Sequence, residues 1–152
     1  MNPQVKNTLS VSLIWFGLAA ISGILLAGCG SGGVDRVPVV KVEAKVLFEG
    51  HPLKGAFVVL HPKSGVNPKA LPARGYVDEQ GVLKPTTYNE GDGVAPGEFA
   101  VTVEYRPLVQ TEDGVSAGPN LLPERYSNPH TTDLVIRVAE GTNEIPPLNL
   151  TR

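Results

Sequence analysis

The sequence predicts an all-β protein, and three observations carry this prediction. Glycine (17) and proline (14) are abundant among the 152 residues and follow no period, which is typical of short strands joined by turns. Apolar and polar residues alternate in several short runs, as they do in strands with one buried face. Turn residues separate these runs. We therefore expect a seven-stranded antiparallel β-sandwich without a helix, preceded by a signal peptide.

Seven runs carry the strand signal, at residues 40–48, 56–61, 74–77, 82–88, 99–106 and 134–138, and from the turn at 141–143 to Leu150. The first, fifth and sixth runs alternate between apolar and polar residues, whereas the second is apolar on both sides. The third and fourth flank the turn Asp78–Gly81. Pro85 has no N–H for a ladder, so the fourth run is expected to be an edge strand or bulged. Pro146 and Pro147 interrupt the seventh run.

The first 28 residues have the pattern of a signal peptide. One cation, Lys6, precedes an uncharged stretch from Leu9 to Ala27. This stretch is also long enough to span a bilayer, so a retained transmembrane anchor is the alternative. The end of the stretch, Leu26-Ala27-Gly28-Cys29, resembles the bacterial lipobox and favours a lipoprotein.

This resemblance implies a role for each lipobox residue. The apolar Leu26 and the small Ala27 and Gly28 would be recognised by the signal peptidase, and the thiol of Cys29 would receive the lipid. Cys29 is the only cysteine, so the chain forms no internal disulfide. We expect a signal peptide over 1–28, a flexible tether over 29–38 and the β domain over 39–152.

Localisation follows from the same residues. Acyl chains on Cys29 would hold the protein at a membrane, with the domain outside the cytoplasm. The residue after Cys29 is Gly30, not the aspartate that resembles an inner-membrane retention signal, so the outer membrane is favoured over the inner one. The net charge of -2 provides no basic excess for phosphates, and we expect no nucleic-acid partner.

Several segments of the domain resemble a known class of sandwich. Residues 50–58 look like the G-x-P-L-x-G-A-x-V opening of carboxypeptidase-regulatory-like and transthyretin-like domains. Asp78–Gly81 resembles their D-x-x-G hairpin, and residues 96–103 their P-G-x-Y-x-V-x-V strand, with Phe99 in place of the usual tyrosine. Residues 122–126, with 131–132 and 141–143, look like small lipoproteins of planctomycete-type bacteria. In carboxypeptidases the resembling module carries none of the chemistry.

The sequence contains no recognisable catalytic motif. The three histidines are far apart and form no metal-ligand pair, and no serine lies in a nucleophile elbow. We therefore expect neither an enzyme nor a cofactor. The one candidate metal site is a weak Ca²⁺ site at Glu90, Asp92 and Glu98. The favoured alternative is a solvated turn in which Asp92 binds the local backbone.

The second strand raises the possibility of an interaction face. Its two-residue period sends Ala56, Val58 and Leu60 to one side and Phe57, Val59 and His61 to the other. The resemblance implies that the first set faces the core. Either the long segment 107–132 covers the second set, or that set contacts a partner. Within this segment, Tyr126 is expected to anchor the loop rather than to stack on a ligand.

The expected function is that of a non-catalytic, membrane-anchored lipoprotein of the cell envelope, whose domain is a binding or structural module. One alternative is a carbohydrate- or peptide-binding module, although aromatic residues make up only 6% of the chain. Another is an accessory subunit of an envelope enzyme or secretion complex. The expected partners are the membrane, through the lipid anchor, and an envelope protein or polysaccharide.

Overall fold

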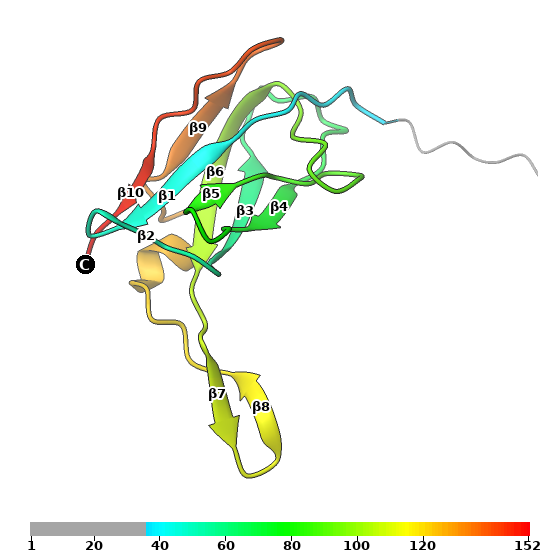
Figure 1. Cartoon of the computed structure of the whole chain (residues 1–152). Coiled ribbons are helices and arrows are strands. Elements are labelled where there is room, and N and C mark those ends of the chain that lie inside the picture. The colour runs from blue at the N-terminus through cyan, green and yellow to red at the C-terminus, as the bar shows by residue number, and fades with distance from the viewer. Residues whose placement is uncertain (1–35) are drawn as a thin grey trace, which may run out of the picture. The chain divides into compact units, whose positions relative to one another are not determined.

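The computed structural model describes residues 36–152, which form an all-β domain (Figure 1). The signal peptide and the lipobox residues Leu26, Ala27, Gly28 and Cys29 lie outside the described residues. No helix among residues 36–152 is long and apolar enough to cross a membrane.

The described part of the chain contains ten strands and one short 3₁₀ helix. They are β1 (Ala44–Phe48), β2 (His51–Pro52), β3 (Phe57–Pro62), β4 (Ala73–Tyr76), β5 (Val82–Leu83), β6 (Gly97–Glu104), β7 (Leu108–Thr111), β8 (Gly114–Ala117), η1 (Glu124–Ser127), β9 (Val135–Val138) and β10 (Leu148–Leu150). The prediction of an all-β chain is confirmed at this level. The predicted strand count was too low, because the turn after β1 adds β2, and the long segment 107–132 contains the hairpin β7–β8.

One sheet has the order β10-β1-β2, with β5 also paired to β1. The turn between β1 and β2 places both Glu49 (φ 49°) and Gly50 (φ 80°) in the left-handed region, as tight hairpin turns require. The pairing of β10 corrects the antiparallel prediction, because β10 runs parallel to β1, with Phe48 opposite Leu150. These two strands are far apart in sequence, so no tight turn forces them to run in opposite directions.

The second sheet has the order β4-β3-β6-β9, and all its pairs are antiparallel. The turn predicted at Asp78–Gly81 is present, and the Asp78 carboxylate accepts the N–H groups of Gln80 (2.9 Å) and Val82 (2.8 Å). β5 ends before Pro85, and Thr86 then bridges to Arg74 at the outer edge of β4.

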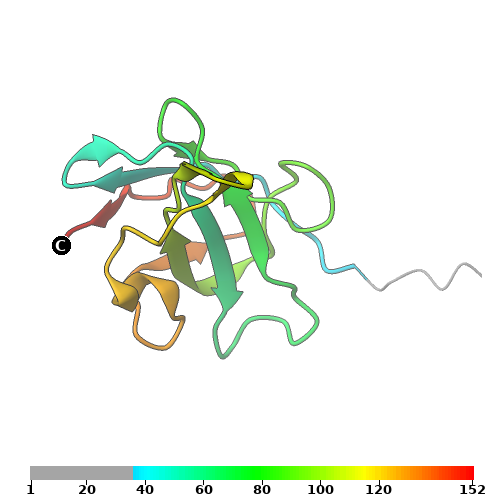
Figure 2. The ribbon, with the colours of Figure 1, turned by 90° about the horizontal axis from the view of Figure 1, so that it is seen from below.

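The core lies between these two sheets (Figure 2). The first sheet contributes Val46, Leu83, Leu148 and Leu150, and the second Val58, Leu60, Phe99, Val101, Val103 and Ile136, all buried. Tyr126 of η1 is also buried, and its hydroxyl accepts the N–H of Thr151 at 3.1 Å. Its predicted role as an anchor for the long segment is therefore confirmed.

We expected a flexible tether up to residue 38, but the chain already contacts the domain at residues 36 and 37. Val37 is buried, and its N–H donates to the hydroxyl of Tyr88 at 3.0 Å. The guanidinium of Arg36 lies 5.2 Å from the centre of the same ring. Residues 36 and 37 are thus fixed to the domain at Tyr88.

Candidate functional site

The acidic loop is organised by its own backbone. The Asp92 carboxylate accepts the N–H groups of Thr87 (2.8 Å), Tyr88 (3.0 Å) and Asn89 (2.9 Å). Partial burial raises the pKa of Asp92, but these amides outweigh it and leave the pKa below its ordinary value. This is the solvated turn that the sequence favoured over a Ca²⁺ site.

The structure does not bring Glu98 to this loop. Glu98 lies on β6, where its carboxylate forms ion pairs with Lys63 and Arg137. Hydrogen bonds from Lys63 and Arg137 lower its pKa. Glu90 is exposed on the acidic loop. Among residues 36–152, no group of three or more His, Cys, Asp or Glu side chains could hold a metal ion.

His61 lies on β3 of the second sheet, whereas His130 lies in the segment between η1 and β9. The Nε2 atom of His61 lies 2.9 Å from the hydroxyl oxygen of Thr102, and burial lowers the pKa of His61. Thr102 is itself buried, which keeps its hydroxyl from a substrate. His61 and His130 line one hollow of about 520 Å³, without a carboxylate in its lining.

The two sides of β3 divide as the sequence predicted. Ala56, just before the strand, and Val58 and Leu60 within it are completely buried in the core. Phe57, Val59 and His61 are half-buried on the opposite side. We call this opposite side of β4-β3-β6-β9 the outer face.

The long segment 107–132 covers only one end of the outer face. Residues 129–132 lie beside His61 and Ala100, and Ala100 is buried although it points outward. At the other end, near Phe57, the hairpin β7–β8 projects from the domain instead of folding over it (Figure 1). Each of the two alternatives, a covering loop or an open surface, therefore holds for one part of the outer face. The long segment covers the His61 end and leaves the Phe57 end open.

A groove lies at the open end of the outer face. It has a volume of about 620 Å³ and is lined by Lys54, Gly55, Phe57, Tyr76, Glu79, Glu104, Tyr105, Arg106, Pro107, Leu108 and Ala117. Phe57 and Tyr76 are opposite each other on β3 and β4, and their ring centres are 5.0 Å apart at 47°. Tyr76 is 70% exposed, which is unusual for a large aromatic side chain.

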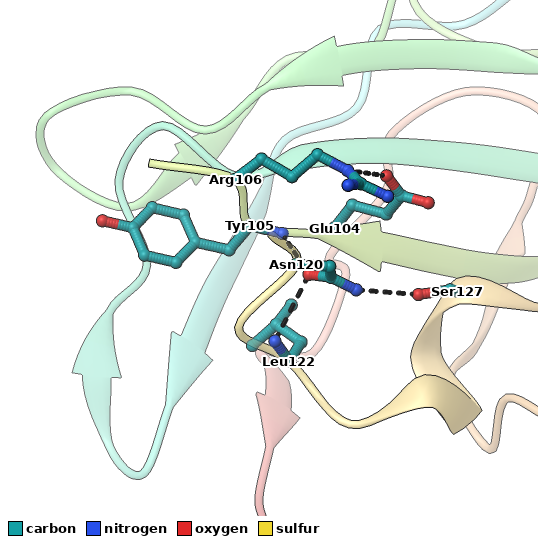
Figure 3. Close-up of polar contacts among 6 residues, drawn as sticks. All are labelled: Glu104, Tyr105, Arg106, Asn120, Leu122 and Ser127. Carbon is teal, nitrogen blue, oxygen red and sulfur yellow. Dashed lines mark hydrogen bonds and ion pairs between the residues drawn. The ribbon is translucent and has the colours of Figure 1, made fainter. Parts of the chain in front are cut away.

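The charged residues of the groove are paired with one another. The Nζ atom of Lys54 lies 3.2 Å from a carboxylate oxygen of Glu79. The guanidinium of Arg106 lies 2.9 Å from a carboxylate oxygen of Glu104 (Figure 3). These two pairs make the groove electrically neutral while they supply fixed hydrogen-bond donors and acceptors beside the rings.

Asn120 fixes the base of the hairpin, which forms one wall of the groove. Its side-chain oxygen accepts the N–H groups of Tyr105 (2.9 Å) and Leu122 (3.3 Å), and its amide donates to Ser127 at 2.9 Å. Figure 3 shows that the Tyr105 ring points away from this network. Because the backbone of Tyr105 is held there, its ring has a defined place in the groove.

The hairpin itself is exposed on both faces. One face carries Leu108, Val115 and Ala117, and Leu108 is 76% and Val115 63% exposed. Leu108 and Ala117 are opposite each other at the base, and both line the groove. The apolar face of the hairpin therefore continues the aromatic surface of the groove.

Sequence reasoning identified Phe57 but missed Tyr76 and Tyr105. The register that places Tyr76 opposite Phe57 is a tertiary property. One signal was available, since Arg74 and Tyr76 alternate with apolar residues and therefore point outward. Asp113-Gly114 is a dipeptide typical of hairpin turns, but nothing in residues 107–132 indicated that a hairpin there would turn Leu108 toward these rings.

A larger hollow, of about 900 Å³, lies along residues 40–45 and 141–147. Its lining has no aromatic or histidine side chain. We therefore take the aromatic groove as the candidate site.

Comparisons of the chain with protein-family models, curated proteins and solved structures find no match. A function for the protein is therefore proposed from the chemistry of the groove. Rings and paired charges can bind and orient a ligand. The lining includes no serine, threonine, cysteine or histidine, and its two carboxylates, Glu79 and Glu104, are each paired with a cation.

Proposed function

We propose that this protein is a non-catalytic, lipid-anchored binding module of the cell envelope. In this proposal Cys29 carries the lipid, the domain lies outside the cytoplasm, and the aromatic groove binds a ligand. The exposed Tyr76, packed against Phe57 in a groove of about 620 Å³, is the observation that carries the binding role.

The proposed fold is a sandwich of the carboxypeptidase-regulatory-like or transthyretin-like type. It is supported by two sheets with a shared core and by the Asp78–Gly81 turn between β4 and β5. In the known modules of this type that lie beside an enzyme, the sandwich has no chemistry of its own. The neutral groove, in which both carboxylates are paired with cations, is consistent with that role.

The described chain begins away from the groove. Its first residues, Arg36 and Val37, are held at Tyr88, which does not line the groove. In Figures 1 and 2 the cyan start of the described chain lies on a different side of the domain from the hairpin β7–β8. In this proposal the tether therefore joins the domain at a point outside the groove.

Binding to isolated envelope fractions tests this proposal. The full chain, in a detergent without a sugar head group, is mixed with separate polysaccharide and protein fractions of the envelope. We expect it to bind one fraction, and Tyr76→Ala to abolish that binding. Val135→Ala is the matched control, because Val135 is 44% exposed on the same outer face but does not line the groove. Equal binding by both variants would contradict a ligand site in the groove.

A further inference from the structure

We propose that the groove binds an uncharged saccharide, with a sugar ring stacked on Tyr76. This inference rests on the proposed function, because it names the ligand class of the same groove. Three properties of the groove lead to it: its exposed ring, its internal neutrality and the absence of open backbone on its walls.

The exposed ring provides a platform. Tyr76 is 70% exposed, yet its orientation is held by the adjacent Phe57 ring at 5.0 Å. An aromatic face binds C–H groups and apolar surfaces, whereas the hydroxyl reaches polar groups at its edge. A pyranose ring presents both, since one face exposes C–H groups and the rim carries hydroxyls.

The charges of the groove favour a ligand without charge. Lys54 is paired with Glu79, and Arg106 with Glu104. The lining therefore carries no net charge that would attract an ion, whereas sugar hydroxyls can donate to the carboxylates and accept from the cations at the same time. Both pairs flank the aromatic rings, as a stacked sugar requires.

An extended peptide finds no backbone partner on the floor of the groove. β3 is paired on both sides, and the outer edge of β4 is occupied by Thr86, which exchanges hydrogen bonds with Arg74. On the hairpin wall, the paired residues Leu108 and Ala117 line the groove, so the hairpin presents one of its faces to the groove and not a strand edge. Strand addition needs an open edge, so recognition here depends on side chains.

The size of the groove fits a short oligosaccharide segment. Its volume of about 620 Å³ is within the range of small-ligand sites, which is roughly 300–1,000 Å³. The exposed Val115 extends the apolar wall along the hairpin beyond the groove. A chain of several sugar units would therefore contact both the rings and the hairpin.

A glycan array followed by calorimetry tests the inference. The full chain, in a detergent without a sugar head group, is applied to neutral and anionic oligosaccharides. We expect binding to neutral members with little dependence on salt. Tyr76→Ala should weaken the affinity by about tenfold or more, whereas Tyr76→Phe, which keeps the ring, should stay within about threefold. Val135→Ala should bind as the wild type does.

The outcomes separate this inference from the proposed function. Binding only to anionic saccharides, or equal binding by Tyr76→Ala and the wild type, would overturn the neutral stacked saccharide. If the array shows no binding but a peptide library yields ligands that Tyr76→Ala loses, the groove remains a binding site and the saccharide is wrong. If neither library yields a ligand that depends on Tyr76, both proposals fail.

Discussion

Asp92 shows how one residue can be mistaken for a metal ligand. A carboxylate in a glycine-rich loop has the composition of a Ca²⁺ site, but here it accepts three backbone N–H groups. The adjacent Gly93 explains why the loop is rich in glycine. Its φ is 102°, and a Cβ atom there would lie 1.9 Å from the carbonyl oxygen of Val40. The loop is therefore built for close approach of two backbone segments.

We expect Asp92→Asn to lower the free energy of unfolding by about 1–3 kcal/mol, because the amide NH₂ cannot accept the hydrogen bonds that one carboxylate oxygen accepts. Urea denaturation measures this loss. Glu90→Gln is the matched control, since Glu90 is exposed in the same loop, and it should change stability by less than about 0.5 kcal/mol. A chelator that lowers the melting temperature of the wild type would instead indicate a bound cation.

The stabilisation that the Asp92 carboxylate provides should depend on pH, and its pKa gives the direction of that dependence. The folded pKa of Asp92 is lower than its ordinary value, so its contribution is present above the unfolded pKa of about 3.9. It is lost as the pH falls through the folded pKa. The stability difference between the wild type and Asp92→Asn should therefore shrink below about pH 4. A difference that grows toward acidic pH would contradict this assignment.

At the scale of elements, the hairpin β7–β8 differs from every other strand pair in the described domain. None of its eight strand residues is buried. By contrast, residues of β1, β3, β4, β5, β6, β9 and β10 all contribute to the core. A two-stranded ribbon alone has marginal stability in water. The hairpin therefore depends on its base, where Gly118 donates to the carbonyl of Pro107 at 2.8 Å.

We expect the hairpin to be dispensable for folding but needed for binding. Residues 108–117 can be replaced by Asn-Gly, because the Pro107–Gly118 hydrogen bond already has the geometry that a two-residue turn closes. The melting temperature should change by only about 2–4 °C, whereas ligand affinity should fall. Thermal unfolding and calorimetry measure the two effects. A much larger loss of stability would show that the hairpin supports the core.

The parallel strand β10, unlike the hairpin β7–β8, is part of the core. Leu150 is 1% exposed and closes the core beside Phe48. We expect Leu150→Ala to cost about 2–5 kcal/mol of unfolding free energy, measured by denaturant titration. The neighbouring Asn149 points outward, and Asn149→Ala should have a small effect. Equal effects of the two substitutions would contradict the observed register of β10.

At the scale of the whole molecule, the proposed anchor predicts how the precursor is processed. Cys29→Ala should leave residues 1–28 attached and remove the lipid, because in this proposal the thiol accepts the diacylglyceryl group. Mass spectrometry of the membrane-bound protein and labelling with palmitate measure both. Ser31→Ala is a matched control beside the cysteine and should be processed normally. A wild-type protein that retains residues 1–28 would contradict the lipoprotein proposal.

The sequence was a reliable guide to the segments that form the core. Val101, Val103, Ile136 and Val138 are all buried, as their alternation predicted. Alternation works here because each sheet has one face on a shared core, and a two-residue period then assigns each side chain to a face. It failed for residues 107–132, because a hairpin exposed on both faces needs no apolar pattern.

The sequence by itself thus determined the all-β class, the turn at Asp78 and the division of β3 into two sides. These properties depend on local periodicity and turn chemistry, which neighbouring residues specify. Only the tertiary structure decided the parallel pairing of β10 and the meeting of Phe57, Tyr76, Tyr105 and Leu108 in one groove. Those contacts join residues far apart in the chain, and strand register, which no local pattern encodes, determines which of them meet.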